Sequence, residues 1–190
     1  MSQPAKTQLR KHYKALRQSV TAKIHAEKSA KIRERICDFI LANSLSSVAI
    51  YYPINNEVDL LGLLPWAKER GVKVYAPKTF SDWSMQFLPV GSDEDFVASG
   101  QWQVPEPVVA IAAPEDTDLP ELIIVPALAF DHLGYRLGYG QGYYDTFLYN
   151  YPGLTIGALF SEFMHPEALP KDEWDMPVQY LLTEAELWKV

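Results

Sequence analysis

The feature that most constrains this chain is the segment 136–145, RLGYGQGYYD, which alternates glycine with other residues directly after an apolar run. Its three glycines are Gly138, Gly140 and Gly142. Because glycine has no Cβ atom, the backbone here can adopt positive φ angles and turn successive N–H groups towards one anion. The residues from Tyr143 onwards have helical character, and a helix that begins there would direct its free N–H groups at the same ligand. The segment therefore predicts a strand, a phosphate-binding loop and a helix, in that order.

The spacing of these glycines disfavours the two commonest nucleotide-binding loops. No Gly-Lys-Ser/Thr sequence follows, as a P-loop NTPase requires, and the later glycines are too close together for the dinucleotide fingerprint. A glycine-rich turn without a ligand is the alternative, but a plain turn needs only one or two glycines. Arg136 adds a fixed positive charge, so a phosphate-binding loop of another type is the better interpretation.

Charge is distributed unevenly along the chain. Residues 1–35 hold ten of the 17 Lys and Arg and two of the 24 Asp and Glu, a net charge of +8, and the remainder carries −15. The basic head could bind nucleic acid or form a solvated face, but the acidic remainder opposes a polyanion as large as DNA. We therefore expect a small anion such as a nucleotide as partner, and no nucleic acid.

A basic helix is expected at residues 5–20, where apolar residues recur at helical spacing and one stripe can dock on the body. Four cations fall on a neighbouring stripe within an arc of about 80°, so they can face one target together. These cations are Lys6, Arg10, Lys14 and Arg17.

The rest of the chain alternates strand patterns with helical patterns. Thr21 is the expected N-cap of a second helix that runs to about residue 42, and a helix at 59–70 should end at Gly71 and be kinked or restarted by Pro65. Strands are expected at 48–52, 72–76, 85–90, 122–126, 154–160 and 180–183, with a loop at 104–120. This order predicts a three-layer α/β/α fold, Rossmann-like, with a mostly parallel sheet, an N-terminal basic helix and ligands beyond the carboxyl ends of the strands.

Length and composition predict one domain over residues 1–190, since 48% of the residues are hydrophobic and can bury a sizeable core. Cys37 is the only cysteine, which excludes an internal disulfide and a cysteine-based zinc cluster and suits a reducing compartment. The N-terminus is polar and basic, and no apolar stretch has the length of a membrane span. We expect a cytoplasmic protein without a membrane partner, and a monomer.

The segment 122–148, LIIVPALAFDHLGYRLGYGQGYYDTFL, resembles the 5-formyltetrahydrofolate cyclo-ligase family, also called methenyltetrahydrofolate synthetase. The similarity covers nearly the whole chain through short matches in the same order. They are Lys6 to Arg10, the triplet Asn56-Glu57-Val58, Trp102 with Glu106-Pro107, the glycine loop, and Asp175. The resemblance implies that ATP and Mg²⁺ are used to convert 5-formyltetrahydrofolate to 5,10-methenyltetrahydrofolate, with release of ADP and phosphate.

The resemblance also implies roles for individual residues. ATP would contact Lys6, Arg10, Arg136, Gly138, Tyr139, Gly140, Gln141, Gly142, Tyr143 and Tyr144. Mg²⁺ would be held by Asp145 and Asp175, whose hard oxygen atoms suit that ion. The folate would contact Tyr52, Glu57, Trp102 and Tyr143. Catalysis would depend on Arg136, Asp145 and Glu57, where Glu57 either accepts hydrogen bonds from the pterin or carries a proton.

The loop departs from the family pattern at three positions. Gln141 and Thr146 stand where many relatives carry a basic residue, and Tyr139 replaces an arginine found in some. These departures make the loop less cationic, and weaker nucleotide binding is the hypothesis that follows.

Two other classes of protein fit parts of the sequence. A sugar-phosphate isomerase on a similar α/β fold would use the phosphate loop without a nucleotide. A non-catalytic RNA-binding module would use the basic head and bind with a steep dependence on salt. The basic first helix and Trp102 favour the ligase over the isomerase.

Overall fold

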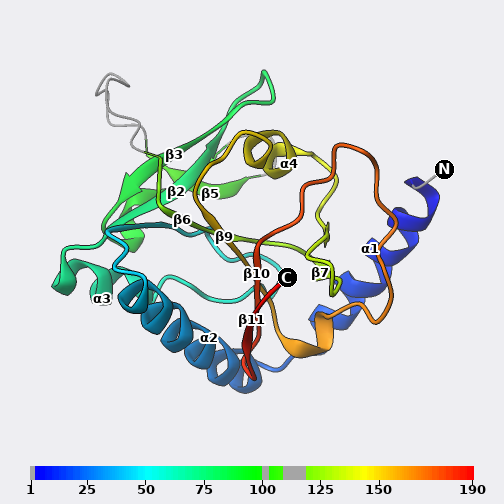
Figure 1. Ribbon diagram of the computed structural model, residues 1–190, viewed down its shortest axis with the longest axis horizontal. Helices are drawn as coiled ribbons and strands as arrows, with labels where there is room; N and C mark the ends of the chain where they lie inside the picture. Colours follow the sequence, from blue (N-terminus) through cyan, green and yellow to red (C-terminus); the bar gives the residue numbers. More distant parts are fainter. Residues whose placement is uncertain (1–2, 100–102, 109–118) are drawn as a thin grey trace.

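The computed structural model describes residues 3–99, 103–108 and 119–190, and within them a seven-stranded sheet forms the centre (Figure 1). In spatial order its strands are β11 (Leu187–Lys189), β10 (Tyr180–Leu182), β9 (Leu154–Ala158), β6 (Leu122–Val125), β1 (Ser47–Ala49), β2 (Lys73–Thr79) and β3 (Met85–Val90). The inner strands run parallel, whereas β3 and β11 pair antiparallel at the two edges. The predicted mostly parallel sheet is confirmed.

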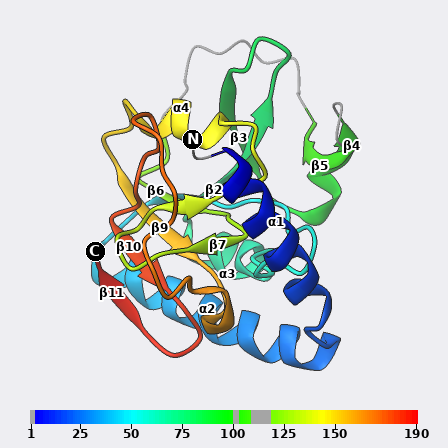
Figure 2. The ribbon, with the colours of Figure 1, turned by 90° about the vertical axis from the view of Figure 1, so that its right-hand side faces the viewer.

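Helices cover both faces of this sheet. In the described part of the chain they are α1 (Gln3–Gln18), α2 (Ala22–Ala42), α3 (Leu63–Arg70) and α4 (Tyr143–Leu148). The helices α2 and α3 lie on one face and α4 lies over the other, as the layered prediction requires (Figure 1). The basic helix α1 stands beside the sheet, next to the loops that follow its strands (Figure 2). None of these described helices has the length and apolar content needed to cross a membrane.

Several short elements were not predicted. Two small antiparallel sheets pair β4 (Phe96–Ser99) with β5 (Val104–Pro107) and β7 (Ala129–Phe130) with β8 (Arg136–Leu137). Two 3₁₀ helices, η1 (Asp93–Asp95) and η2 (Ser161–Phe163), complete the fold. The loop expected at 104–120 was wrong at its start, where the chain forms strand β5. The buried Glu106 carboxylate ties β5 to β2, because Oε2 lies 3.0 Å from Lys78 Nζ and Oε1 accepts the Thr79 N–H at 3.2 Å. Two-residue strands and a Pro-Glu-Pro strand carry no alternating pattern that sequence analysis could detect.

The helix expected at 59–70 begins four residues later, at Leu63. Residues 59–62 are fixed to α2 instead: the Asp59 N–H donates to Ser29 Oγ at 3.1 Å, and Arg33 Nη1 donates to the Asp59 carbonyl at 2.7 Å. Pro65 therefore falls in the first turn, where its missing N–H costs no intrahelical bond. Gly71 ends the helix in the left-handed conformation at φ 68°, as predicted.

The core lies at β1 and β6, which are buried on both faces. Every residue of β6 is fully buried, as are Val48 and Ala49 of β1. Parallel strands covered by helices on both sides are near-continuous apolar runs for this reason. The candidate site lies in the loops beyond the ends of these strands.

Gly157, in β9, packs closely against the core, and a mutation can test this packing. A Cβ atom on Gly157 would lie 2.5 Å from Cζ of the buried Phe130 ring. We expect Gly157→Ala to lower the free energy of unfolding by about 1–3 kcal/mol, the usual cost of overpacking a core. Urea denaturation measures this change.

Gly91→Ala is the matched control, because its new Cβ would meet only Asp95 Oδ2, at 3.8 Å. It should change the stability by less than about 0.5 kcal/mol. A Gly157→Ala variant as stable as the wild type would contradict the packing described for β9.

Candidate active site

Charged and aromatic side chains gather beyond the carboxyl ends of β1 and β6. The loop after β1 carries residues 50–57, and β6 is followed by β7, β8 and the glycine loop. Helix α1 and the loop of residues 164–179 close the same region from the side (Figure 2). This is the position that an open, mostly parallel sheet gives to its ligand site.

The glycine loop has the predicted conformation at two of its three glycines. Gly140 and Gly142 adopt φ angles of 107° and 78°, which side chains with a Cβ atom rarely tolerate. The expectation for Gly138 was wrong: its φ is not positive, and a Cβ there would meet nothing within 4 Å. Its carbonyl instead accepts a hydrogen bond from Arg10 Nε at 2.9 Å, which brings the Arg10 guanidinium against Gly140.

Helix α4 is shorter than its sequence indicated, so it would add little to an anion site. It has six residues, fewer than two turns, so few peptide dipoles add up along its axis. Phosphate binding would depend on the amides of the loop and on the nearby cations.

Arg136 and Asp145 form an ion pair across the glycine loop. Arg136 Nη2 lies 2.8 Å from Asp145 Oδ1, and the arginine side chain is 5% exposed. Both residues also bind the backbone of Met176: Arg136 Nη1 donates to its carbonyl at 2.9 Å, and Asp145 Oδ1 accepts from its N–H at 3.0 Å. Burial lowers the pKa of Arg136, while the charge of Asp145 opposes this shift, and the guanidinium stays protonated.

Lys6 lies between two carboxylates of the loop 164–179. Its Nζ atom is 2.9 Å from Asp172 Oδ2 and 2.5 Å from Asp175 Oδ2. Asp175 Oδ2 also accepts the Asp172 N–H at 2.9 Å, which fixes the turn between them. Burial lowers the pKa of Lys6, but the hydrogen bonds to both carboxylates outweigh this effect and raise it. Asp172 was not predicted, although the run Asp-Glu-Trp-Asp offered a signal.

Glu57 is buried at the end of a tight turn. The Glu57 N–H donates to the Ile54 carbonyl at 2.9 Å, and the two residues between, Asn55 and Asn56, have φ angles of 50° and 56°. Asparagine tolerates this left-handed conformation better than most residues, so the local sequence sets the turn. Glu57 Oε2 accepts the Ile54 N–H at 3.1 Å. Burial raises the pKa of Glu57 to about 7, although the charge of Arg17 opposes this.

Three phenols and one guanidinium surround the Glu57 carboxyl. The Tyr139 hydroxyl contacts it directly, and burial followed by the charge of Glu57 raises the pKa of Tyr139 to about 12. The same two causes raise the pKa of Tyr51 and of Tyr144. Within the part of the chain that the structure describes, four buried atoms here have no hydrogen-bond partner: Tyr51 Oη, Tyr144 Oη, Arg17 Nε and Arg17 Nη1. Unpaired buried polar groups are costly, which indicates that a ligand or solvent satisfies them.

The other cations of the α1 stripe also reach this region. Arg17 is 2% exposed, donates to the carbonyls of Ala127 and Leu128, and stacks on the Phe163 ring at 4.7 Å. Lys14 Nζ lies 5.4 Å from the centroid of the Tyr139 ring. The predicted stripe is therefore directed at one region. Arg17 and Tyr51 were nevertheless missing from the predicted site residues, since buried Arg and Tyr more often have packing roles.

Aromatic rings flank the glycine loop and the loop after β1. The Tyr52 ring packs on Phe96 at 5.2 Å, and the Tyr143 ring lies 5.7 Å from Trp83 with an interplanar angle of 32°. Trp83 is 59% exposed and was not predicted. Trp102 lies outside the described residues. Gln141 is half-buried in the loop between Gly140 and Gly142.

A cavity of about 880 Å³ opens beside the turn that carries Glu57. It is lined by residues of that turn and of the segment 59–62, by His25 of α2, by α3 and by the turn after β3. Glu57 is among the lining residues, and its carboxyl contacts Tyr139 of the glycine loop, which does not line the cavity. Its size is within the range that small-molecule sites occupy.

Comparison with known proteins places the chain in one family. The 5-formyltetrahydrofolate cyclo-ligase family matches residues 2–184. The 5-formyltetrahydrofolate cyclo-ligase of Escherichia coli K12 is 26% identical over 178 residues, which cover 91% of this chain and 97% of the relative. That of Mus musculus is 26% identical over 191 residues, covering 95% and 94%.

Solved structures agree with this match. The 5,10-methenyltetrahydrofolate synthetase of Aquifex aeolicus superposes with a TM-score of 0.80 at 32% identity, covering 97% of this chain and 92% of that one. The synthetase of Mycoplasma pneumoniae gives a TM-score of 0.74 at 22% identity, covering 94% and 98%, and supports the fold.

The open sheet and the charged cluster at its carboxyl edge define an α/β protein with a candidate small-ligand site. The chain belongs to the 5-formyltetrahydrofolate cyclo-ligase family. This membership confirms the resemblance, the fold class and the prediction of an enzyme. It also favours a folate ligase over an isomerase or an RNA-binding module.

The raised pKa of Glu57 predicts how stability depends on pH. The folded protein keeps the Glu57 proton up to about pH 7, whereas an exposed carboxyl loses it near 4.5. The stability that Glu57 contributes is therefore full below pH 4.5 and is lost as the pH rises through 7. Between pH 5 and pH 8 the wild type should lose about 2–3 kcal/mol relative to Glu57→Gln, which cannot ionise.

Urea unfolding of both proteins across this pH range measures the difference. Glu34→Gln, which changes an exposed carboxyl on α2, is the control and should follow the wild-type curve. A constant difference between Glu57→Gln and the wild type would show that Glu57 is ionised throughout.

Proposed function

We propose that this protein uses ATP and Mg²⁺ to convert 5-formyltetrahydrofolate to 5,10-methenyltetrahydrofolate, with release of ADP and phosphate. Its family supports a folate ligase, for which ATP is the implied co-substrate. The single observation in this chain that carries the proposal is the position of Glu57. Glu57 lines the cavity of about 880 Å³, and its buried carboxyl contacts Tyr139 of the glycine loop. Glu57 therefore lies where the ATP at the glycine loop and the folate in the cavity would meet.

The glycine loop and α1 would hold the triphosphate of ATP. The loop offers backbone N–H groups around Gly140 and Gly142, whose positive φ angles allow them to converge on an anion. Arg10 lies against the loop, and Arg136 precedes the loop and pairs with Asp145 just after it. Lys6 and Arg10 are one turn apart on α1, so both would reach the phosphates from this helix.

The folate would occupy the cavity beside Glu57. Its pterin and aminobenzoyl rings are flat and partly apolar, and a slot with a few polar groups suits them. Tyr52 is placed next to this turn, and Tyr143 borders the glycine loop. A stacking role for Trp102 remains an expectation from the family resemblance.

The residues present fit Mg²⁺ as the metal. Asp145 and Asp175 supply hard carboxylate oxygens, and each is already bound to a cation, which shows that positive charge is stabilised at both places. No group of three or more potential metal ligands occurs among the described residues. Mg²⁺ commonly binds through one or two carboxylates together with water and substrate phosphates. The ion would neutralise charge on the transferring phosphoryl group.

The reaction requires the formyl oxygen to become a leaving group. Amine attack on a formamide alone would stall, because that oxygen leaves poorly. Transfer of the terminal phosphoryl group of ATP to the formyl oxygen solves this problem. The neighbouring anilino nitrogen then attacks the formyl carbon, its proton departs, and the C–O bond breaks with loss of phosphate.

The side chains would act by positioning and charge in the first step. Phosphoryl transfer needs little covalent help from a protein, so Arg10, Arg136 and Lys6 would orient the phosphates and stabilise their charge. The second step is a ring closure within one molecule, where orientation alone can supply on the order of 7 kcal/mol. Glu57, with a pKa of about 7, is suited to accept the proton that the anilino nitrogen loses. Its burial also keeps water from the activated formyl group.

The proposal predicts a direct spectroscopic result. Incubation of the wild type with 5-formyltetrahydrofolate and Mg-ATP should produce the ultraviolet absorption of the methenyl product. Arg10→Ala should raise the KM for ATP by about ten- to a hundredfold, because a hydrogen bond between charged groups contributes about 1.5–3 kcal/mol.

Lys11→Ala is the control, since Lys11 is the adjacent, exposed cation on the same helix. It should leave the KM for ATP unchanged. A wild type that forms no methenyl product would refute the proposed function, and equal effects of the two substitutions would remove Arg10 from the nucleotide site.

A further inference from the structure

We propose that His25 of α2 is a positioning residue for the turn of residues 54–57, and that it acts on the reaction through Glu57. The inference rests on the proposed function, because Glu57 lines the cavity in which we place the folate. The helix α2 carries none of the site residues predicted from the sequence. This inference gives it a part in setting the position of one of them.

His25 makes a hydrogen bond to the backbone of Glu57. Its Nε2 atom lies 2.7 Å from the Glu57 carbonyl oxygen. A carbonyl oxygen can only accept, so Nε2 carries the proton in this contact. The half-buried imidazole also meets the ring of the fully buried Phe160 in a T-shaped contact, with the centroids 5.5 Å apart. These two contacts fix the ring on two sides.

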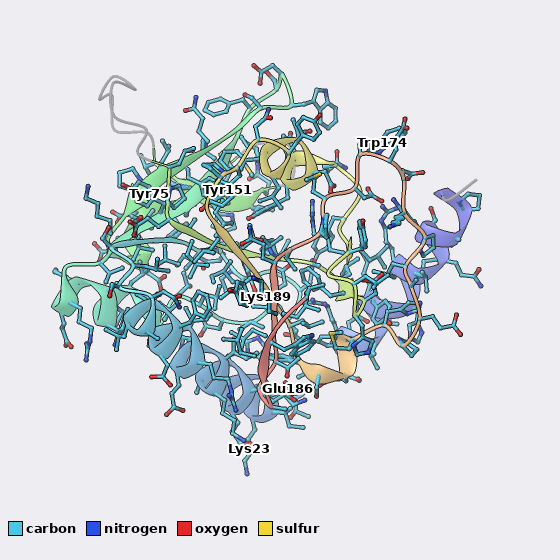
Figure 3. All side chains as sticks on the ribbon, in the orientation of Figure 1. Lys23, Tyr75, Tyr151, Trp174, Glu186 and Lys189 are labelled. Atoms are coloured by element: carbon cyan, nitrogen blue, oxygen red, sulfur yellow. The ribbon has the colours of Figure 1, made fainter. Side chains whose placement is uncertain are left out.

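The side of α2 that carries His25 faces the protein. Figure 3 shows Lys23, two residues earlier, pointing away from the protein near the start of the helix, and its side chain is 85% exposed. Two residues correspond to a rotation of about 200° around the helix axis. His25 therefore points inward, in agreement with its place in the lining of the cavity.

Two further polar residues follow His25 at intervals of four on this side of α2. They are Ser29 and Arg33. Both bind the backbone of Asp59: its N–H donates to Ser29 Oγ at 3.1 Å, and its carbonyl accepts from Arg33 Nη1 at 2.7 Å. One side of α2 thus holds the chain at Glu57 and again two residues later. The position of the Glu57 carboxyl therefore depends on this helix.

The turn needs such contacts from outside. Asn55 and Asn56 adopt φ angles of 50° and 56°, a conformation that costs free energy in residues other than glycine and persists where surrounding contacts determine it. The Asn56 side chain donates to a carbonyl in the last turn of α1 at 2.8 Å, and Asn55 Nδ2 donates to the Tyr139 hydroxyl at 3.3 Å. His25 adds the contact at Glu57 itself. Without this contact, Glu57 can shift relative to the cavity.

The first test determines the tautomer of His25 in the full chain without ligands. At about pH 8, where an ordinary histidine is neutral, the proton should lie on Nε2, because the Glu57 carbonyl offers no proton. Correlation of the ring ¹⁵N and ¹H signals by NMR shows which nitrogen is protonated, and His25→Gln identifies the signals. A neutral His25 with its proton on Nδ1 would overturn the proposal.

The second test separates the folate side of the site from the ATP side. His25→Leu should lower kcat/KM for 5-formyltetrahydrofolate by about three- to tenfold, as the loss of one hydrogen bond does. The dissociation constant of 5-formyltetrahydrofolate without ATP, measured by calorimetry, should rise by a similar factor. The KM for ATP should stay within about twofold of the wild-type value, because the glycine loop keeps its own contacts.

Three matched variants identify the hydrogen bond as the cause. His25→Gln places an amide nitrogen as many bonds from Cα as Nε2 is, and it should restore folate binding to within about twofold of the wild type. His25→Asn places that nitrogen one bond closer to the backbone and should behave like His25→Leu. His132→Leu makes the same change at an exposed histidine and should have no effect.

Ser29→Ala distinguishes positioning from direct contact with the folate. Ser29 is fully buried, so it cannot touch a ligand in the cavity, but it binds the same segment as His25 does. Ser29→Ala should also raise the dissociation constant of 5-formyltetrahydrofolate and leave the KM for ATP unchanged. Wild-type folate binding by Ser29→Ala would show that His25 acts by touching the folate, and would overturn its positioning role.

Equal folate affinity of His25→Leu and His25→Gln would also overturn the proposal. Its failure differs from failure of the proposed function, because the NMR measurement and the folate titration use no ATP. A wild type that binds folate and forms no methenyl product would refute the reaction. The order of the His25 variants in folate binding would still decide the role of His25.

Discussion

The ion pairs of Lys6 and Arg136 hold the first helix, the glycine loop and the loop of residues 164–179 together at the end of the sheet. These segments are far apart in the sequence, and each brings charge into a poorly solvated place. Buried charges are tolerated only when they are paired and hydrogen-bonded, so the positions of these segments depend on one another. The loop of residues 172–176 is the common partner, because both ion pairs bind either its side chains or its backbone.

The buried carboxyl of Glu57 complements this arrangement. Two successive asparagines in left-handed conformations turn the chain after β1, so that Glu57 lies between the cavity and the glycine loop. Burial raises its pKa to about 7, while Arg17 on α1 limits the shift. The same helix carries both groups of cations. Lys6 and Arg10 lie near the glycine loop and the loop of residues 164–179, and Arg17 lies near the Glu57 carboxyl.

Sequence reasoning predicted the parts of this fold that have a periodic pattern. The inner strands β1 and β6 are continuous apolar runs, Thr21 caps α2 and Gly71 ends α3, and each of these signals is local. Five short strands, β4, β5, β7, β8 and β11, escaped because their pairing depends on contacts outside any local pattern, as in the attachment of β5 to β2 through Glu106. The onset of α3 was misplaced because Ser29 and Arg33, some 30 positions earlier, fix Asp59 outside the helix.

The candidate site was predicted through its glycines and through the family resemblance, but the partners of its residues were not. No local pattern indicates that Lys6 would pair with Asp172 and Asp175, more than 160 positions away. Similarly, nothing in the sequence around Gly138 shows that its carbonyl, rather than a positive φ, would matter. Such contacts arise only when the chain brings distant segments to one end of the sheet.

The central claim is that the glycine loop holds a triphosphate next to a bound folate. A crystal structure with Mg²⁺, a non-hydrolysable ATP analogue and 5-formyltetrahydrofolate tests it most directly. The account predicts the phosphates against residues 138–142 and the terminal phosphate in line with the formyl oxygen. A nucleotide bound elsewhere would contradict it.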